Sequence, residues 1–240
     1  RKIANSRNVP KTNQIKHIDS VRKVTKIISE DLNSIGINHN YAPVIDASPN
    51  KVVSNRSFGL NMDTVISFSN EFISVTQSHN IIATAKHFPG HGFVKGDTHK
   101  ELIYIDGEMK EVKNYPPLIE NGVLSVMVAH LAIKNNQEFN TEGMPSTCSK
   151  KIVTDLLKDS LGFKGLVITD AMNMGGVVNV KNSGLKAAIA GCDQLLMPIN
   201  EKQVLFNILS YMSDNEDFQQ QIYKSVKKII RMKICLGLLN

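Results

Sequence analysis

The sequence predicts an α/β fold, a TIM (β/α)8-type barrel that is incomplete at its N-terminus. Short, continuous apolar segments alternate with amphipathic helical segments along the 240 residues. Strands that are apolar throughout, rather than at every second residue, are typical of a parallel sheet covered by helices. Ionisable residues follow several of these strands, and reactive groups at the carboxyl ends of several strands are the arrangement of a barrel.

Five segments are predicted to be β-strands: 41–46, 81–86, 123–129, 166–169 and 193–198. Four of them end in a polar or ionisable residue, at Asp46, Lys86-His87, His130 and Asp170. A doubly wound open sheet would concentrate such groups at a single switch point, so we prefer the barrel. Because a closed barrel has eight strands, we expect residues 1–240 to form one partial barrel domain that lacks N-terminal βα units.

The helical segments follow from their apolar periodicity. Asp19 or Ser20 can cap a first helix that ends near Gly36, and a second helix is expected from about 63 to 79. Residues 1–17 are polar and irregular, which indicates a linker or the remnant of a loop. Further helices are expected at 108–121 (interrupted by Pro116 and Pro117), at 150–161 and around 185–190, followed by two closing helices.

Composition excludes several classes of protein. Apolar residues make up 42% and charged residues 21% of the chain, as in ordinary soluble globular proteins. The sequence holds no run of about 18 apolar residues, so we expect no membrane-spanning helix. Because it begins with Arg rather than Met, a leader could lie outside it, and a cytoplasmic and an exported location are both compatible. We expect a monomer.

The net charge of +6 is spread along the chain. Its densest basic cluster, at residues 224–233, alternates with apolar residues and is interpreted as the solvated face of a C-terminal helix, not as a nucleic-acid site. Cys148, Cys192 and Cys235 lie far apart without a CxxC spacing. We interpret them as reduced, mostly buried thiols that form neither a disulfide framework nor a zinc site.

Residues 85–100 (AKHFPGHGFVKGDTHK) concentrate the candidate chemistry. Asp97 and His99 are two positions apart, and a carboxylate that binds one imidazole nitrogen fixes the tautomer and makes the other nitrogen a better base. The same pair could also be a simple loop-closing contact. The surrounding glycines favour the functional interpretation, because they let a loop approach a ligand closely.

Strand ends supply the other candidates. Lys86 and His87 can both reach a pocket where the backbone bends, although Lys86 could instead be ion-paired to a neighbouring carboxylate as a structural strut. Asp170 ends an apolar strand, where a carboxylate must be paired, hydrogen-bonded or functional. It is therefore a helix N-cap, a nucleophile or a general base. Arg56 could anchor a polar substrate group or brace Asp46.

Cofactor and metal motifs are weak. His87 and His91 are four residues apart, but the intervening Pro89-Gly90 makes a helical presentation unfavourable, and the glutamate of HExxH is absent. The glycines at 90, 92 and 96 match neither a dinucleotide fingerprint nor a phosphate-binding loop, and there is no GxSxG elbow. We therefore expect neither a metal nor a cofactor.

A family resemblance rests on these same residues. Residues 86–92 (KHFPGHG), followed by Asp97-Thr98-His99, closely resemble the signature of glycoside hydrolase family 3 β-N-acetylglucosaminidases, the NagZ-type β-hexosaminidases. The likeness extends to residues 42–46, 55–59 and 161–170, and it covers roughly residues 20–200 in the order of the family.

The resemblance implies a retaining exo-β-N-acetylglucosaminidase that removes terminal β-linked N-acetylhexosamine from small sugars derived from peptidoglycan or chitin. Asp170 matches the nucleophile of the family, and His99 matches the acid/base on a mobile loop, with Asp97 as its partner. Arg56, Lys86 and His87 match the residues that bind the sugar. Most retaining enzymes use two carboxylates, so a His–Asp pair would replace the usual acid.

The sequence also departs from the family. Its members carry an upstream strand that ends in Asp-x-Glu-Gly-Gly, a segment that binds sugar hydroxyls and is absent from this sequence. This agrees with the strand count and leaves other hypotheses open. One is a non-catalytic sugar-binding barrel or an inactive fragment, and another is transfer of the glycosyl unit to phosphate.

Overall fold

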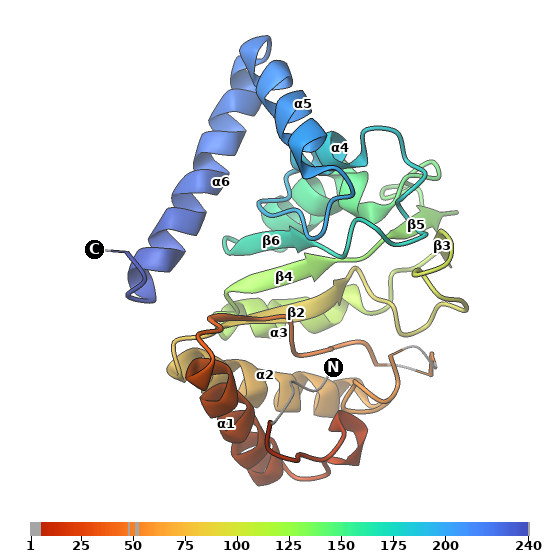
Figure 1. The fold of residues 1–240 in the computed structure, drawn as a ribbon. Coiled ribbons are helices and arrows are strands. Elements are labelled where there is room, and N and C mark those ends of the chain that lie inside the picture. Colours follow the sequence, from red (N-terminus) through yellow and green to blue (C-terminus); the bar gives the residue numbers. More distant parts are fainter. Residues whose placement is uncertain (1–5, 48, 51–52, 240) are drawn as a thin grey trace.

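A parallel sheet forms the centre of the molecule. The computed structural model describes residues 6–47, 49–50 and 53–239. In these ranges, four strands pair in the order β1 (His39–Asn40), β2 (Ile82–Phe88), β4 (Ser125–Val128) and β6 (Leu166–Thr169) (Figure 1). An isolated parallel bridge between Ile168 and Gln194 extends the sheet by one more segment. Five parallel segments that neighbour one another in chain order form part of a barrel wall, which confirms the predicted fold class.

The strand bounds differ from the prediction at both edges of this sheet. β1 lies just before the segment predicted at 41–46, and within that segment only Val44 is paired, by single bridges to Lys86 and Ser57. The segment predicted at 193–198 is reduced to the bridge at Gln194. In the described part of the chain, both predicted strands are therefore reduced to isolated bridges.

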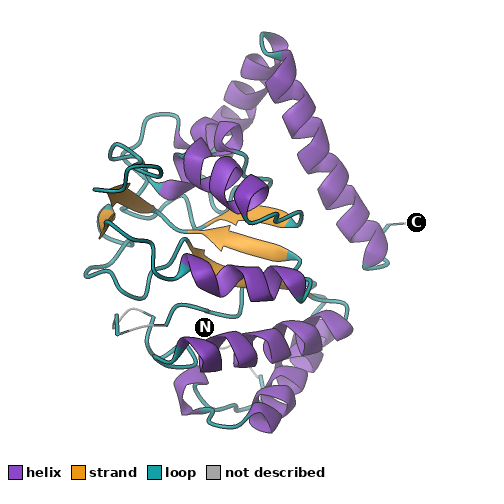
Figure 2. Cartoon of the chain, turned by 180° about the vertical axis from the view of Figure 1, so that it is seen from behind, coloured by secondary structure: helices purple, strands orange, loops and turns teal. Residues whose placement is uncertain are grey.

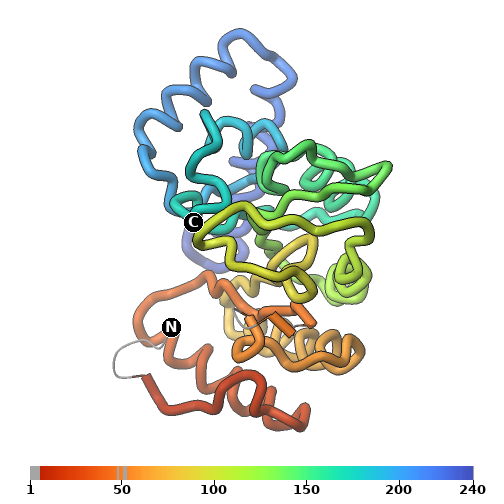
Figure 3. Tube along the Cα trace, turned by 90° about the vertical axis from the view of Figure 1, so that its right-hand side faces the viewer, coloured from red at the N-terminus to blue at the C-terminus, as the bar shows by residue number. Residues whose placement is uncertain are grey.

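A second, two-stranded parallel sheet was not predicted. It pairs β3 (Ile103–Asp106) with β5 (Leu131–Lys134), with Ile103 opposite Leu131. β3 alternates buried and exposed residues and follows a loop rich in charge, so it lacks the continuous apolar pattern of the central strands. This sheet lies beyond the carboxyl ends of the central strands, among the loops seen end-on in Figure 3.

Helices cover the sheet, as Figure 2 shows from behind. They are α1 (Ile18–Ser34), α2 (Met62–Ser78), α3 (Tyr115–Glu120), the π-helix η4 (Lys151–Ser160), α4 (Ser183–Ala190), α5 (Glu201–Ser213) and α6 (Glu216–Cys235). The described residues also form three short 3-10 turns: η1 (Thr12–Gln14), η2 (Val112–Asn114) and η3 (Ser146–Cys148). The predicted alternation of strands and helices is therefore present.

Two predicted helix boundaries were wrong. His17 precedes α1 at the N-cap position, so neither Asp19 nor Ser20 caps that helix. Pro116 and Pro117 occupy the first turn of α3, where a backbone N–H has no partner within the helix. These prolines therefore begin the helix and do not interrupt it.

The segment predicted to be a linker packs on α1 over the residues that the structure describes. Arg7 forms ion pairs with Glu30 at 2.9 Å and with Asp31 at 2.7 Å. Ile15 is buried in the core. Residues 6–17 are therefore part of the domain, and residues 1–5 of that prediction lie outside the described residues.

The C-terminal hairpin of α5 and α6 projects from the sheet (Figure 1), and a buried carboxylate is among the groups that bind it. Asp193 accepts hydrogen bonds from Ser225 Oγ at 2.6 Å and from Lys228 Nζ at 3.2 Å. Lys228 therefore has a buried partner, while the other basic residues of the cluster at 224–233 are exposed, as expected. No helix within the described ranges is both long and apolar enough to cross a bilayer.

The cysteines agree with the prediction in part. All three are free thiols, and Cys192 is buried and Cys148 half-buried. Cys235, at the end of α6, is exposed, so the expectation of a buried thiol was wrong there. Burial raises the pKa of the Cys148 thiol to about 11, which keeps it protonated at neutral pH.

Candidate active site

The carboxyl end of β2 places two successive side chains inside the protein. Lys86 pairs with Met127 of β4 and Phe88 pairs with Val128, so His87 is the extra residue of a bulge. A bulge re-aims side chains that would otherwise alternate between the two faces of a sheet. Lys86 and His87 are both buried, with 9% and 5% of their surface exposed.

His87 is oriented by Asp46, which lies at the end of the neighbouring segment. Its Nδ1 lies 2.7 Å from Asp46 Oδ2, and Asp46 Oδ1 accepts from the backbone N–H of His91 at 2.8 Å. Burial lowers the pKa of His87 well below its ordinary value and raises that of Asp46 to about 6. A neutral imidazole that donates from Nδ1 to Asp46 keeps the lone pair of Nε2 available to a ligand.

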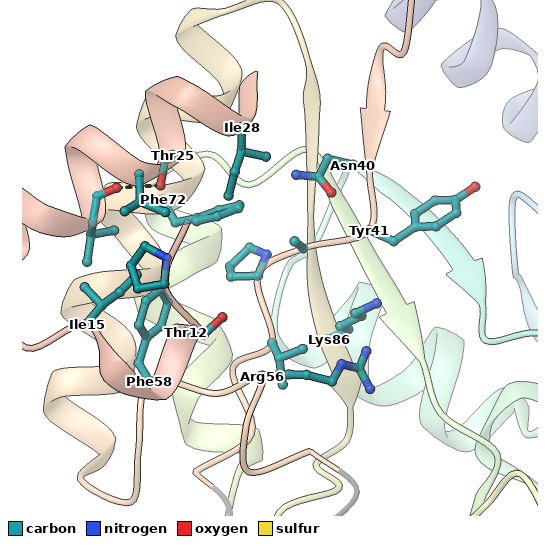
Figure 4. Close-up of a pocket in the computed structure, with 16 residues that line it drawn as sticks. Thr12, Ile15, Thr25, Ile28, Asn40, Tyr41, Arg56, Phe58, Phe72 and Lys86 are labelled. Atoms are coloured by element: carbon teal, nitrogen blue, oxygen red, sulfur yellow. Dashed lines mark hydrogen bonds between the residues drawn. The ribbon is translucent and has the colours of Figure 1, made fainter. Parts of the chain in front are cut away.

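Two cations line one wall of a pocket of about 280 Å³ between α1 and β2. Figure 4 shows Arg56 and Lys86 with their charged ends directed the same way, away from the apolar residues Ile15 and Phe58 at the other end. Burial and the charge of Arg56 lower the pKa of Lys86 to about 8. Within the described residues, Lys86 Nζ and the Arg56 guanidinium form no ion pair.

The described residues show neither of the purely structural roles considered for these two cations, an ion pair of Lys86 with a carboxylate or a contact of Arg56 that braces Asp46. Lys86 is not the strut of an ion pair, and Arg56 is exposed and forms no ion pair with Asp46 in the described part of the chain. The carboxylate of Asp46 instead binds the backbone and ring of His87 and the backbone of His91. Both cations therefore remain available to a polar ligand.

Asp170 follows β6 and is half-buried. Its Oδ1 accepts the N–H of Ala171 at 2.8 Å, and the segment that follows is a series of turns, so Asp170 is not a helix N-cap. Burial by itself would raise the pKa of Asp170. Electrostatic interactions with His87, His130 and Lys86, together with the Ala171 hydrogen bond, nevertheless lower that pKa overall. An ionised carboxylate at this position suits a nucleophile or a general base.

His130, at the end of β4, lies beside Asp170 and was noted in the sequence only as a polar strand end. It is fully buried, with Nδ1 at 2.9 Å from Thr147 Oγ1 and Nε2 at 3.0 Å from the carbonyl oxygen of Ala171. Burial lowers its pKa. His130 therefore braces the backbone that follows Asp170.

The Asp97–His99 pair lies on the β2–β3 loop (residues 89–102). Asp97 Oδ1 accepts from the His99 ring at Nδ1, at 2.6 Å, and from the His99 backbone N–H at 3.0 Å. Burial opposes ionisation of Asp97, but the hydrogen bonds from His99 lower its pKa overall. The His99 side chain is 58% exposed, so its Nε2 faces solvent while Nδ1 is fixed by the carboxylate.

This loop also contains buried residues that sequence reasoning did not select. Thr98, between the two members of the pair, is only 1% exposed. Its Oγ1 lies 3.0 Å from His91 Nε2, and Asn50 Nδ2 donates to the carbonyl oxygens of Val94 and Gly96. The position of His91 within the 86–92 motif is the one signal that could have indicated this role.

Glu111 is a further buried carboxylate that the sequence did not reveal. Its oxygens accept the N–H groups of Ala47 at 2.6 Å and Gly92 at 2.7 Å. Burial and the nearby charge of Asp46 raise its pKa to about 8. A Cβ on Gly90 or Gly92 would lie 2.5 Å from Glu111 atoms, so glycine is required for this close approach. Glu111 joins the segment after Asp46 to the start of the β2–β3 loop.

The predicted site residues thus gather at the carboxyl ends of the central strands. The loop of Asp97 and His99 touches the β6–α4 loop (residues 170–182) that begins with Asp170, through Gly175 N–H to His99 O at 3.0 Å. Across the described residues, no group of three or more His, Cys, Asp or Glu side chains is placed to hold a metal ion. The arrangement combines a carboxylate, a histidine with a carboxylate partner, and cations for a polar ligand.

Comparison with known families identifies the sequence family of this chain. The profile of the "Glycosyl hydrolase family 3 N terminal domain" matches residues 8–232. The chain belongs to glycosyl hydrolase family 3. The family match extends beyond residues 20–200, over which the sequence motifs were recognised.

Relatives of this family 3 chain carry hexosaminidase names. Beta-hexosaminidase A of Pseudoalteromonas piscicida is 30% identical over 239 residues, which covers 88% of this chain and 40% of that protein. The beta-hexosaminidase of Psychromonas ingrahamii is 32% identical over 193 residues, or 76% of this chain and 56% of that protein. The chain thus spans about half, or less, of the length of these relatives.

A solved structure agrees with this family 3 assignment. The glycoside hydrolase family 3 beta-N-acetylglucosaminidase from Paenibacillus sp. str. FPU-7 matches with a TM-score of 0.83 and 27% sequence identity. The match covers 92% of this chain and 44% of that structure. The family 3 barrel is therefore the fold of this chain as well as its sequence family.

Proposed function

We propose that the protein containing this chain is a retaining exo-β-N-acetylglucosaminidase that acts on small carbohydrates derived from peptidoglycan or chitin. The observation that carries the proposal is the pairing of Asp170, a carboxylate stabilised in its ionised form, with a His99–Asp97 pair on the adjoining loop. The similarity to proteins named beta-hexosaminidase supports the choice of substrate.

In the first step, Asp170 acts as the nucleophile. One of its oxygens forms a bond to the anomeric carbon while the bond from that carbon to the leaving oxygen breaks, which gives a glycosyl-enzyme. The lowered pKa of Asp170 keeps this carboxylate ionised near neutral pH. The hydrogen bond from Ala171 holds Oδ1, so Oδ2 is the oxygen free to attack.

His99 supplies and recovers the proton. The ionised Asp97 stabilises the imidazolium through Nδ1, and the solvent-facing Nε2 gives its proton to the leaving oxygen. In the second step, Nε2 takes a proton from water as the water oxygen attacks the anomeric carbon and releases Asp170. The configuration at that carbon is retained after two inversions.

Arg56, Lys86 and His87 bind the sugar in this proposal. Lys86 and Arg56 are cations without ion-pair partners among the described residues, and both can donate to sugar hydroxyls. His87 contributes Nε2, because its Nδ1 is held by Asp46. Burial of Lys86 and His87 fixes both groups before the sugar arrives.

Trapping the glycosyl-enzyme tests the proposal. The complete natural polypeptide is incubated with 5-fluoro-N-acetylglucosaminyl fluoride and digested, and the labelled peptide is identified by mass spectrometry. We expect the label on Asp170, with Asp159, an aspartate beyond the site on η4, as the unlabelled internal control. A label on another residue, or no label on an active enzyme, would contradict the assignment.

Two other functions have distinct outcomes in the same preparation. A non-catalytic sugar-binding barrel would bind N-acetylglucosamine without turnover and would be unaffected by His99→Ala. Transfer to phosphate would give N-acetylglucosamine 1-phosphate and a rate that rises with phosphate concentration. The histidine acid/base places no carboxylate of its own before an anionic acceptor, so product analysis with and without phosphate separates hydrolysis from transfer.

A further inference from the structure

The loop that carries the dyad is attached to the loop that carries the nucleophile. The N–H of Gly175 donates to the carbonyl oxygen of His99 at 3.0 Å, and the N–H of Gly176 donates to that of Thr98 at 2.9 Å. Both glycines lie in the β6–α4 loop that begins with Asp170. Two parallel backbone hydrogen bonds therefore join the two loops, and both acceptors lie at or next to His99.

Space requires a glycine at position 175, and it is tight at position 176. A Cβ on Gly175 would lie 2.1 Å from the carbonyl oxygen of Lys100 and 2.2 Å from its carbon. A Cβ on Gly176 would lie 3.0 Å from His130 Cβ and 3.2 Å from the carbonyl oxygen of Thr98. The obstacles at Gly175 are backbone atoms, which cannot rotate aside as the end of a side chain can.

The buried side chain of Thr98 stabilises the same contact between the two loops. Thr98 is almost fully buried, although its neighbour His99 is exposed and its neighbour Asp97 is half-buried. Its hydroxyl lies 3.0 Å from His91 Nε2, and the backbone N–H of His91 is held by Asp46 at 2.8 Å. Thr98 thus connects the Asp97–His99 pair to the residues that follow β2, and its carbonyl oxygen accepts the N–H of Gly176.

We propose that Thr98, Gly175 and Gly176 are positioning residues for the acid/base step: they dock the β2–β3 loop on the β6–α4 loop and thereby fix His99 relative to Asp170. The inference rests on the proposed function, because it concerns proton transfer by His99. None of the three side chains or glycines supplies a reacting group. Their effect is on the geometry of His99, and a displacement of about 1 Å can lower a rate by about 10²-fold.

The dependence of rate on the leaving group separates this role from a general loss of structure. kcat/KM is measured on the complete natural polypeptide with aryl N-acetylglucosaminides that carry either 2,4-dinitrophenol or 4-methylphenol. Dinitrophenolate leaves without a proton, whereas 4-methylphenol needs His99. A misplaced acid lowers only the second value, while unfolding of a fraction of the enzyme lowers both equally.

The ratio of kcat/KM for the 2,4-dinitrophenyl substrate to kcat/KM for the 4-methylphenyl substrate should rise in both variants. We expect Gly175→Ala to raise it by about 10²-fold. Thr98→Val should raise it by about tenfold, the effect of one hydrogen bond. Thr98→Ser keeps the hydroxyl and should restore the wild-type ratio. Thr76→Val is a matched control, because Thr76 is buried in α2 with an unpaired hydroxyl. Gly184→Ala, in α4, is a second control, because the added Cβ would lie 2.7 Å from the Val204 side chain of α5, away from the dyad.

Hydrogen exchange of the amides at residues 97–101 tests the docking without any assay of activity. Exchange should be faster in Gly175→Ala than in wild type and unchanged in Gly184→Ala. An unchanged leaving-group ratio in folded Gly175→Ala and Thr98→Val, with an active wild type, would overturn the inference. A wild type inactive on both substrates would instead refute the proposed function, and the exchange measurement would still decide whether the loops dock.

Discussion

Lys86 and His87 lie within the sheet, whereas Asp97 and His99 lie on a loop, where Asp97 is half-buried and His99 is exposed. The first pair is buried at the end of β2, and its orientation is set by Asp46. The second pair is held through backbone contacts and through the neighbouring Thr98. Groups that bind a substrate are thus fixed in advance, whereas the group that transfers a proton depends on how one loop sits on another.

The largest loss of kcat/KM should come from a change at Asp170, the proposed nucleophile. Asp170→Asn replaces the nucleophile by an amide of nearly the same shape, and we expect kcat/KM to fall by roughly 10⁴-fold or more. The change should be measured on the dinitrophenyl substrate, so that proton donation does not contribute. Asp106→Asn, on the exposed part of β3, is the matched control and should leave the rate unchanged. Substantial activity in Asp170→Asn would assign the nucleophile elsewhere.

The buried cation of the first region should appear in the pH profile. Lys86 has a pKa lowered to about 8, so it is charged below that pH and loses its proton above it. We expect kcat/KM to fall by about tenfold per pH unit above pH 8, because the sugar then loses a charged donor. Lys86→Gln should be less active at neutral pH and should lack this alkaline limb. An unchanged limb in that variant would assign the titration to another group.

A smaller effect, on stability, should come from the carboxylate that joins the two regions. Glu111 accepts two backbone N–H groups, and Glu111→Gln places an amide N–H against one of them. We expect a loss of about 1–3 kcal/mol in the free energy of unfolding at pH 5, measured by denaturant titration. Gln77→Glu, near the end of α2, tests a similar exchange at a more exposed position, where the side chain bonds the backbone of Gly122 and Leu124.

The loss of unfolding free energy caused by Glu111→Gln should become smaller as the pH rises. The pKa of Glu111 is about 8 in the folded protein against an ordinary 4.5, so the folded state holds the proton more tightly than the unfolded chain. Stability of the wild type therefore declines between about pH 4.5 and pH 8, while the glutamine has no proton to lose. A difference that stays constant over that range would show that Glu111 does not titrate there.

The sequence was sufficient for the wall of the barrel and for the strand ends. Continuous apolar segments such as 166–169 were sufficient to predict strands, and the end of that strand indicated Asp170 as a candidate site residue. β3 could not be found in the same way, because its four residues alternate between buried and exposed and its pairing with β5 is long-range. The strand predicted at 193–198 was too long, because the structure pairs it only at Gln194. Its apolar residues indicated a strand, but an apolar sequence does not show how many residues pair with a neighbouring strand.

Residues that support the site were harder to predict. Glu111 lies in a stretch rich in Lys and Glu that is typical of a solvated surface, and it is buried by contacts with the distant residues Ala47 and Gly92. Gly175-Gly176 has no periodic signal, and its role depends on how closely Lys100 approaches. Both roles arise from contacts between distant parts of the chain, which propensity and local pattern do not encode.

The difference between the two regions is tested most directly by two histidine variants assayed on the two aryl substrates. His99→Ala should lower kcat/KM by about 10²–10⁴-fold with 4-methylphenol as the leaving group and only slightly with 2,4-dinitrophenol. His87→Asn, whose amide can still donate to Asp46, should lower both values by a similar factor, because binding is shared by both substrates. Equal losses on the two substrates for His99→Ala would contradict the assignment of His99 as the acid.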